Sequence, residues 1–170
     1  MATGERASTG KRDQHLRIHG RGEAQEIIAG MLAQARHKVS IFSPTLDGYL
    51  FNTAPIAKAL ASFAAAHRKN LVRFLIEDVD QSLHHNARIV ELCRRLSDFI
   101  KIRAVDEDHA GLQEMFLIID DNAYLHQPDT QKQDYIAGFE GTRKAKHFAN
   151  QHEHMWECSL AITAIHKLGL

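Results

Sequence analysis

Two arginines inside predicted strands are the side chains of this sequence best suited to hold an anion. Arg73 and Arg103 each lie within a short apolar run. A cation buried in a sheet needs a carboxylate or an anion beside it, because removing an unpaired charge from water is costly. Glu77 or Asp120 could supply a structural ion pair. A bound anion is the alternative, and the candidate anion-binding residues are then Arg73, Arg103 and His84.

Histidine and glutamate are concentrated near the end of the chain, at His147, His152, Glu153, His154 and Glu157. This density is typical of metal ligands, but the His-Glu-x-x-His spacing is absent. His152 and His154 point about 200° apart on a helix with ~3.6 residues per turn. The pattern favours a solvated polar face with one buried imidazole. We therefore expect no metal site and no cofactor.

Acidic residues follow several of the predicted strands. In open α/β sheets a ligand crevice lies beyond the carboxyl ends of the parallel strands. An acidic rim is the opposite of what a phosphate cradle needs, and His84 and His85, at the start of the third predicted helix, are the candidate compensating cations. The loop at 43–47, together with Tyr49, is placed to cover a pocket there. The residues at these strand ends are Ser43, Asp47, Glu77, Asp78, Asp106 and Glu107.

The stretch at 111–121 reads Gly-Leu-Gln-Glu-Met-Phe-Leu-Ile-Ile-Asp-Asp. It resembles the central motif of the phospholipase D superfamily, His-x-Lys-x-x-x-x-Asp around an apolar strand, commonly followed by Gly-Ser-x-Asn. The nucleophilic His position holds Gln113, the phosphate-binding Lys position holds Met115, and the Asp position holds Asp120. The positions of the second motif hold Gln127, Pro128 and Thr130.

These replacements remove the chemistry that the resemblance would otherwise imply. Covalent phosphodiester transfer needs a nucleophile, and it needs cations on the charge that develops at phosphorus. The carboxamide of Gln113 is not a competent nucleophile, and the thioether of Met115 carries no charge. Asp120 alone can neither attack a phosphodiester nor neutralise it. The resemblance therefore implies the fold and argues against the activity.

Further local details are similar to this superfamily. They are the Ala-x-x-x-Val-x-Ile pattern at 35–41, the Val-Arg-x-Leu-Ile pattern at 72–76, and an aromatic residue at Phe148 followed by Trp156-Glu157. Their order extends the resemblance to one repeat over 16–170. The chain looks closest to an uncharacterised bacterial branch whose members lack the catalytic motif.

Composition is that of an ordinary globular domain. The 170 residues are 44% apolar and 25% charged, and the formal net charge is zero, so no global charge favours nucleic acid or an anionic membrane. Cys93 and Cys158 fall in helical patterns and are expected to be buried thiols. With no membrane span and no signal peptide, a cytoplasmic location is expected.

The chain alternates strand and helix patterns and then changes. After the strand at 100–105, three short strands with little between them predict an antiparallel meander. Predicted strands are 15–18, 39–42, 71–76, 100–105, 115–120, 123–126 and 134–139, and predicted helices are 23–37, 55–69, 82–98 and 142–168. Residues 1–13 are predicted to be a flexible tail, and 14–170 a single domain.

We therefore predict an α/β fold with a mixed, mainly parallel sheet and helices on both faces, in a phospholipase D-like single domain. The favoured function is a non-catalytic domain that acts in binding or assembly. Active single-repeat relatives form two-fold dimers, so the resemblance implies a homodimer through the face around Gln113, Met115 and Asp120.

Two alternatives stay open. One is a phosphodiesterase or nuclease of altered chemistry that uses another histidine, such as His84 or His109. The other is a nucleic-acid adaptor that uses the basic tail and a helix face with Arg88, Arg94 and Arg95, although acidic residues interleave with that face. A phosphate-bearing ligand is compatible with both.

Overall fold

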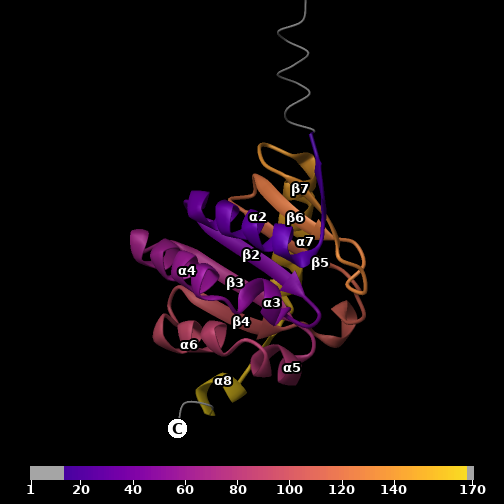
Figure 1. The fold of residues 1–170 in the computed structure, drawn as a ribbon. Coiled ribbons are helices and arrows are strands. Elements are labelled where there is room, and N and C mark those ends of the chain that lie inside the picture. Colours follow the sequence, from indigo (N-terminus) through magenta and orange to yellow (C-terminus); the bar gives the residue numbers. More distant parts are fainter. Residues whose placement is uncertain (1–13, 168–170) are drawn as a thin grey trace, which may run out of the picture.

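The structure is a computed structural model that describes residues 14–167, and its centre is one twisted sheet (Figure 1). The predicted tail at 1–13 lies outside the described residues. Within the described part, eight strands pair in the order β1-β7-β6-β5-β2-β3-β4-β8. Their bounds are β1 Leu16–His19, β2 Lys38–Ser43, β3 Leu71–Ile76, β4 Ile100–Ala104, β5 Met115–Ile119, β6 Ala123–Gln127, β7 Asp134–Gly138 and β8 Leu160–Ala161.

The sheet is mixed, as predicted, but the expectation that it is mainly parallel is wrong. Only the pairs β2–β3 and β3–β4 are parallel, because only these are joined by helical crossovers. The meander does not extend the sheet beyond β4. Instead β5 returns to pair antiparallel with β2, while β1 and β8 add antiparallel edges. Most neighbours are consequently antiparallel.

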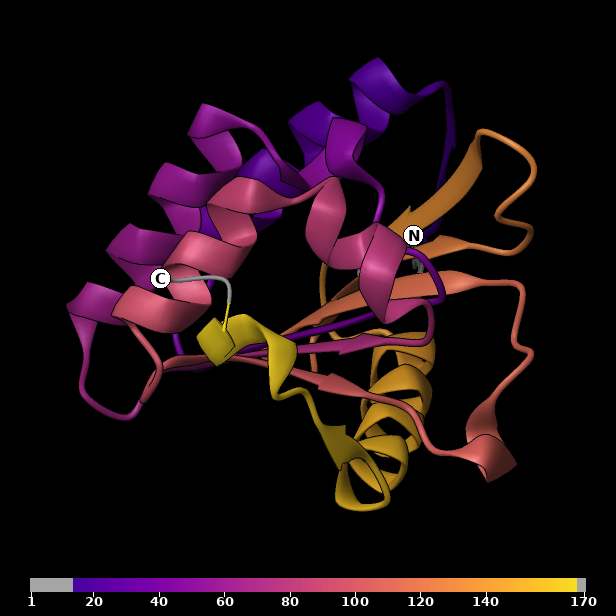
Figure 2. The same ribbon diagram turned by 90° about the horizontal axis from the view of Figure 1, so that it is seen from below.

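Helices cover both faces of the sheet, as predicted (Figure 2). Helices α2 to α6 lie over one face and α7 over the other, and α8 follows the edge strand β8. The helices are α2 Arg21–Gln34, α3 Gly48–Phe51, α4 Ala54–Ala66, α5 Val79–His84, α6 Ala87–Arg95, α7 Arg143–Glu157 and α8 Ala164–Lys167, with a 3-10 turn, η1, at Glu107–His109.

Two predicted helices differ from the observed ones. The helix expected at 82–98 is divided into α5 and α6 at Asn86. The side chain of Asn86 is buried and donates to the carbonyl oxygens of Leu46 and Ser82, at 2.9 and 2.8 Å. The last predicted helix ends at Glu157 rather than continuing. Apolar residues beyond it keep a helical spacing, which concealed β8 from periodicity.

The sheet separates two apolar cores. One contains Ile28, Leu60 and Ile89 of α2, α4 and α6, packed on the sheet face that they cover. In the other core the ring of Phe148 from α7 stacks on Phe116 of β5, with centroids 4.9 Å apart. Strand alternation sends neighbouring side chains into opposite cores, and this explains why the buried strands read as continuous apolar runs. Among the described residues, no helix is long and apolar enough to cross a membrane.

The two cysteines differ in their surroundings. Cys93 is buried, as predicted, and desolvation raises the pKa of its thiol to about 12. The prediction for Cys158 is wrong, because that residue is exposed. It lies just past the end of α7, where the predicted helix would have continued.

Candidate functional site: an acidic cleft at the motif positions

A cleft of about 710 Å³ lies beyond the ends of the central strands, along the edge of the sheet where those strands end or begin. Strands β2 and β3 end at this edge, β5 begins there, and β6 ends there, since Phe42 pairs with Phe116 and Met115 with Gln127. The cleft therefore occupies the predicted position beyond the carboxyl ends of parallel strands. Four of the six positions equivalent to the phospholipase D motifs line it, and these are Gln113, Met115, Gln127 and Thr130.

The floor and the rim of the cleft differ in exposure. Met115 is only 1% exposed and belongs to the apolar core beneath the cleft. Gln127 is also buried, and its amide donates to the carbonyl oxygen of Lys132 at 2.7 Å. Gln113 is exposed at the rim. In place of a nucleophile and a cation, the cleft thus presents a carboxamide above a thioether.

One wall of the cleft is the loop after β2, as the sequence predicted. The amides of Glu77 and Asp78 donate to the carbonyl oxygen of Pro44, at 3.0 and 2.8 Å. The amide of Leu46 donates to the hydroxyl of Ser82 at 2.9 Å. These bonds attach the loop to the segment that follows β3, so this wall is braced by its neighbour.

Gly48 makes a close approach that reinforces this wall. A Cβ at that position would lie 2.5 Å from the carbonyl oxygen of His85. Only glycine allows two backbones to come so close. The carboxylate of Asp47 caps α3 by accepting from the amide of Tyr49 at 2.9 Å.

The charges of the cleft are mainly negative. Asp47, Glu77 and Asp78 line it, against the cations Arg21 and, when protonated, His85. Arg21 lies 3.1 Å from the carboxylate of Asp47 and is therefore already paired. A phosphate entering here would meet uncompensated carboxylates. The predicted acidic rim is present at these positions, but Asp106 and Glu107 do not line this cleft.

Asp120 lies at the opposite end of β5, about 16 Å from Met115 for an extended strand. Its carboxylate accepts from the amides of Arg36, His37 and Lys38, at 2.9, 2.8 and 2.8 Å. The first two amides belong to the connection from α2 to β2, and the third is that of the first residue of β2. Asp120 therefore closes a structural joint, and it does not share the cleft with Gln113 and Met115.

Arg73 and Arg103 lie on the face of the sheet that α7 covers. Arg73 bonds to the carboxylate of Glu153 at 2.8 Å, a partner on α7 that differs from the two carboxylates considered from sequence. Arg103 donates to the hydroxyl and the carbonyl oxygen of Ser159, at 2.6 and 2.7 Å. Both guanidinium groups lie over the ring of Trp156; the Cζ atoms of Arg73 and Arg103 are 5.0 and 5.7 Å from the ring centroid.

The three candidate anion-binding residues do not share one cavity. Arg73 and Arg103 line a hollow of about 450 Å³ at the β4 edge, together with Lys101. His84 lines a different hollow, beside α6. The imidazole of His152 is the buried one of the last helix, and its Nε2 lies 3.1 Å from the carbonyl oxygen of Ile41.

Sequence reasoning missed three residues of the cleft, namely Arg21, Asn52 and Gln131. Arg21 opens α2, and its place beside Asp47 depends on α2 lying next to α3, which periodicity does not reveal. His85 lines the cleft as a candidate cation, whereas His84, predicted with it, does not.

Comparison with known families identifies the family of this chain. The model of DUF7931, a domain of unknown function, matches residues 20–168. The chain belongs to this family. A search among proteins of curated function finds no match to the sequence.

Solved structures with this fold include members of the phospholipase D superfamily. NucT from Helicobacter pylori is 12% identical, with a TM-score of 0.63 over 88% of this chain and 99% of that chain. Nuc from Salmonella typhimurium, a phospholipase D family member, is 13% identical, with a TM-score of 0.60 over 86% and 97%.

TrmBL2, an archaeal chromatin protein with a novel mode of DNA binding, is 14% identical, with a TM-score of 0.62 over 88% of this chain. The present chain spans about half of that protein, 54% of its length. At such identities these likenesses show a phospholipase D-like fold and nothing further.

Proposed function

We propose that this chain is a non-catalytic phospholipase D-like domain that acts in binding or assembly through the acidic cleft. The observation that carries the proposal is the chemistry of the motif-equivalent positions. Gln113, Met115, Gln127 and Thr130 line one cleft, and they offer amides, a thioether and a hydroxyl instead of a histidine and a lysine. Covalent phosphodiester transfer of the phospholipase D type uses the latter groups.

The ligand class follows from the lining. Carboxamides donate and accept hydrogen bonds, and the carboxylates of Asp47, Glu77 and Asp78 attract positive charge. Arg21 offsets one of these carboxylates only. The cleft is therefore suited to a polar partner that is neutral or cationic, such as a lysine- or arginine-bearing segment of protein.

Self-association through this face is the second part of the proposal. Tyr49 stands 55% exposed at the rim of the cleft, with the guanidinium carbon of Arg21 5.7 Å from its ring centroid. Exposed aromatic and arginine side chains are enriched in protein interfaces. Met115 is buried within its own chain, so the rim residues rather than Met115 would form the contact.

Two measurements test this function. Purified protein is assayed for hydrolysis of bis(p-nitrophenyl) phosphate and of single-stranded DNA, and the expected rate equals that of buffer. Hydrolysis that is lost in His85→Ala would overturn the non-catalytic proposal. Sedimentation of the wild type and of Tyr49→Glu tests assembly: the wild type is expected to be a dimer and the variant a monomer, and a monomeric wild type would remove the homodimer.

Nucleic-acid binding is distinguished by its dependence on salt. A nucleic-acid adaptor would bind DNA with an affinity that falls steeply as salt rises. On the proposed helix face, Arg94 is paired with Glu91, and the carboxylate offsets the positive charge of Arg94. We expect fluorescence anisotropy with labelled DNA to show no salt-sensitive binding. Tight binding lost in a variant with Arg88 and Arg95 both changed to Glu would favour the adaptor instead.

A further inference from the structure

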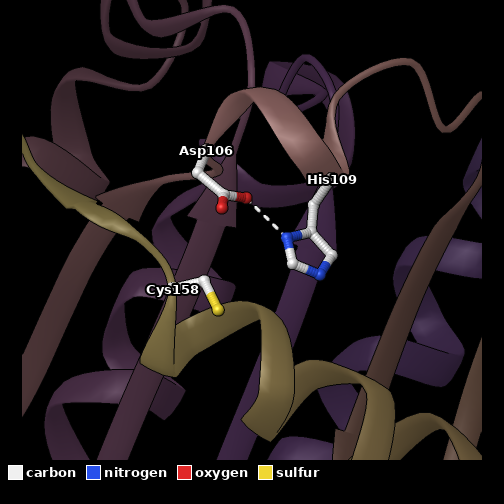
Figure 3. Close-up of side chains that lie close together, drawn as sticks. All are labelled: Asp106, His109 and Cys158. Carbon is white, nitrogen blue, oxygen red and sulfur yellow. Dashed lines mark hydrogen bonds and ion pairs between the residues drawn. The ribbon is translucent and has the colours of Figure 1, made fainter.

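Three potential metal ligands meet outside the cleft, at the far end of α7. Asp106, His109 and Cys158 each offer one ligand atom, and these atoms all lie within 4.8 Å of one another. Figure 3 shows the three side chains close together, with Cys158 on a segment far along the chain from Asp106 and His109. We propose that these three side chains bind a zinc ion.

The local fold places two of the ligands on one turn. Asp106 precedes the 3-10 turn η1, and His109 ends it, so the two are three residues apart and face the same way. Nδ1 of His109 lies 2.5 Å from the carboxylate of Asp106. Both side chains are about one-fifth exposed. They are thus held together but remain open to a solvated ion.

The third ligand is held in place by strand β4. Cys158 caps the end of α7, and its amide donates to the carbonyl oxygen of His154 at 3.4 Å. The next residue, Ser159, accepts two hydrogen bonds from Arg103 of β4, and β8 then pairs with β4. Because β4 also leads directly into Asp106, both halves of the site are anchored to the same strand.

The ligand set suits zinc in type and charge. Thiolate, imidazole and carboxylate are its usual protein ligands, and the two negative charges balance the ion. Around a tetrahedral zinc such atoms lie roughly 3.4–3.6 Å apart. The ligand atoms now lie within 4.8 Å of one another, so the side chains must rearrange to reach that spacing. Binding replaces the hydrogen bond between Asp106 and His109 by two bonds to the ion; the proton on Nδ1 of His109 moves to Nε2, and the thiol proton of Cys158 is released to solvent.

Three protein ligands leave a fourth position for water or for another side chain. The ring of His154 lies near His109, with centroids 5.1 Å apart. On α7 it is one turn before Cys158 and therefore on the same side of the helix. The zinc would tie the end of α7 to the loop after β4. This role is separate from the acidic cleft and does not depend on the function proposed for it.

The test uses the full chain, stripped of metal with a chelator and titrated with zinc against a chromophoric competitor. We expect one zinc per chain, and a loss of affinity of at least ~100-fold in Cys158→Ser and in His109→Ala. His19→Ala is the matched control, since His19 pairs with Asp134 at 2.6 Å and neither residue belongs to the proposed zinc site. Undiminished binding in Cys158→Ser, or no binding by the wild type, would overturn the proposal.

Two further readouts do not rely on affinity. Cobalt in place of zinc is expected to give a thiolate-to-cobalt charge-transfer band that Cys158→Ser lacks; a wild type without this band has no thiolate ligand, and the site is then rejected. Zinc should also slow alkylation of Cys158 by iodoacetamide, measured on its peptide by mass spectrometry. The buried thiol of Cys93 stays unreactive throughout and serves as the internal reference. An unchanged rate at Cys158 would contradict zinc binding there.

Discussion

The carboxylate of Asp120 accepts a hydrogen bond from the backbone amide of His37 at 2.8 Å, and this bond fixes the connection between α2 and the sheet. Two adjacent amides donate to the same carboxylate. The position equivalent to the aspartate of a catalytic motif is therefore occupied, in this chain, by a structural residue. It lies at the end of β5 that is remote from the cleft, so its loss should affect stability alone.

We expect Asp120→Ala to lower the free energy of unfolding by about 3 kcal/mol, because three amides lose a charged acceptor. The backbone φ of 55° at this residue adds to the cost, since alanine disfavours that region. Asp120→Asn should cost less. Urea unfolding measures each value, and Asp121→Asn, at a φ of 54° and exposed, is the matched control. A loss below ~0.5 kcal/mol in Asp120→Ala would contradict the structural role.

How much of this fold was predictable follows from what each pattern encodes. The strand around Phe116 could be predicted because four consecutive apolar residues signal burial on both faces. The acidic cleft was located because parallel strands end at a common edge, which holds whatever their order. The return of β5 to β2 could not be predicted. Strand order depends on pairing across long loops, and periodicity carries no information about it.

The same limit explains the site residues. Gln113 and Met115 were placed near one another because they are two residues apart at the start of one strand. The motif grouped Asp120 with them, although the length of β5 separates Asp120 from Met115. Cys158 was assigned to a helix because the apolar spacing continues past it. The helix ends at Glu157, and Ser159 just beyond it accepts a bond from Arg103, a contact that sequence spacing does not reveal.

Gly48 provides a test of the braced cleft wall. Replacing it with alanine would put a Cβ 2.5 Å from the carbonyl oxygen of His85, and the backbone must shift to relieve this contact. We expect a loss of about 1–3 kcal/mol by urea unfolding. Gly30→Ala is the control, because that helical position is open, and there alanine should stabilise by ~0.5–1 kcal/mol. Equal effects at both positions would argue against the close approach.

Met115→Lys tests whether the floor of the cleft tolerates a cation. The thioether is 1% exposed, so a lysine must either lose its hydration or extend into the cleft. We expect destabilisation by roughly 2 kcal/mol, without recovery of phosphodiesterase activity, because Gln113 still provides no nucleophile. Met115→Leu should cost less than ~1.5 kcal/mol. The dimer is expected to persist, since the rim and not Met115 forms the proposed contact, and dissociation of Met115→Lys at full stability would contradict this.

His152 predicts a specific dependence of stability on pH. Burial lowers the pKa of its imidazole to about 4 from 6.5, and the nearby charges of Arg73 and Lys38 act in the same direction. The unfolded chain therefore binds the proton more readily than the folded protein between these two values. Stability rises with pH across this window and is lost as pH falls from 6.5 toward 4, by up to about 3 kcal/mol.

The measurement compares the free energy of unfolding of the wild type and His152→Gln at several pH values in the presence of a chelator. Glutamine can still donate to the carbonyl oxygen of Ile41, but it lacks the buried ring, so the variant should be less stable near pH 7. Because glutamine does not titrate, the variant should lose less stability on acidification. Carboxylates contribute equally to both proteins, and the difference between the two curves isolates His152. His147→Gln, exposed on the same helix, should follow the wild type. Parallel curves for the wild type and His152→Gln would show that this imidazole is not held neutral by burial.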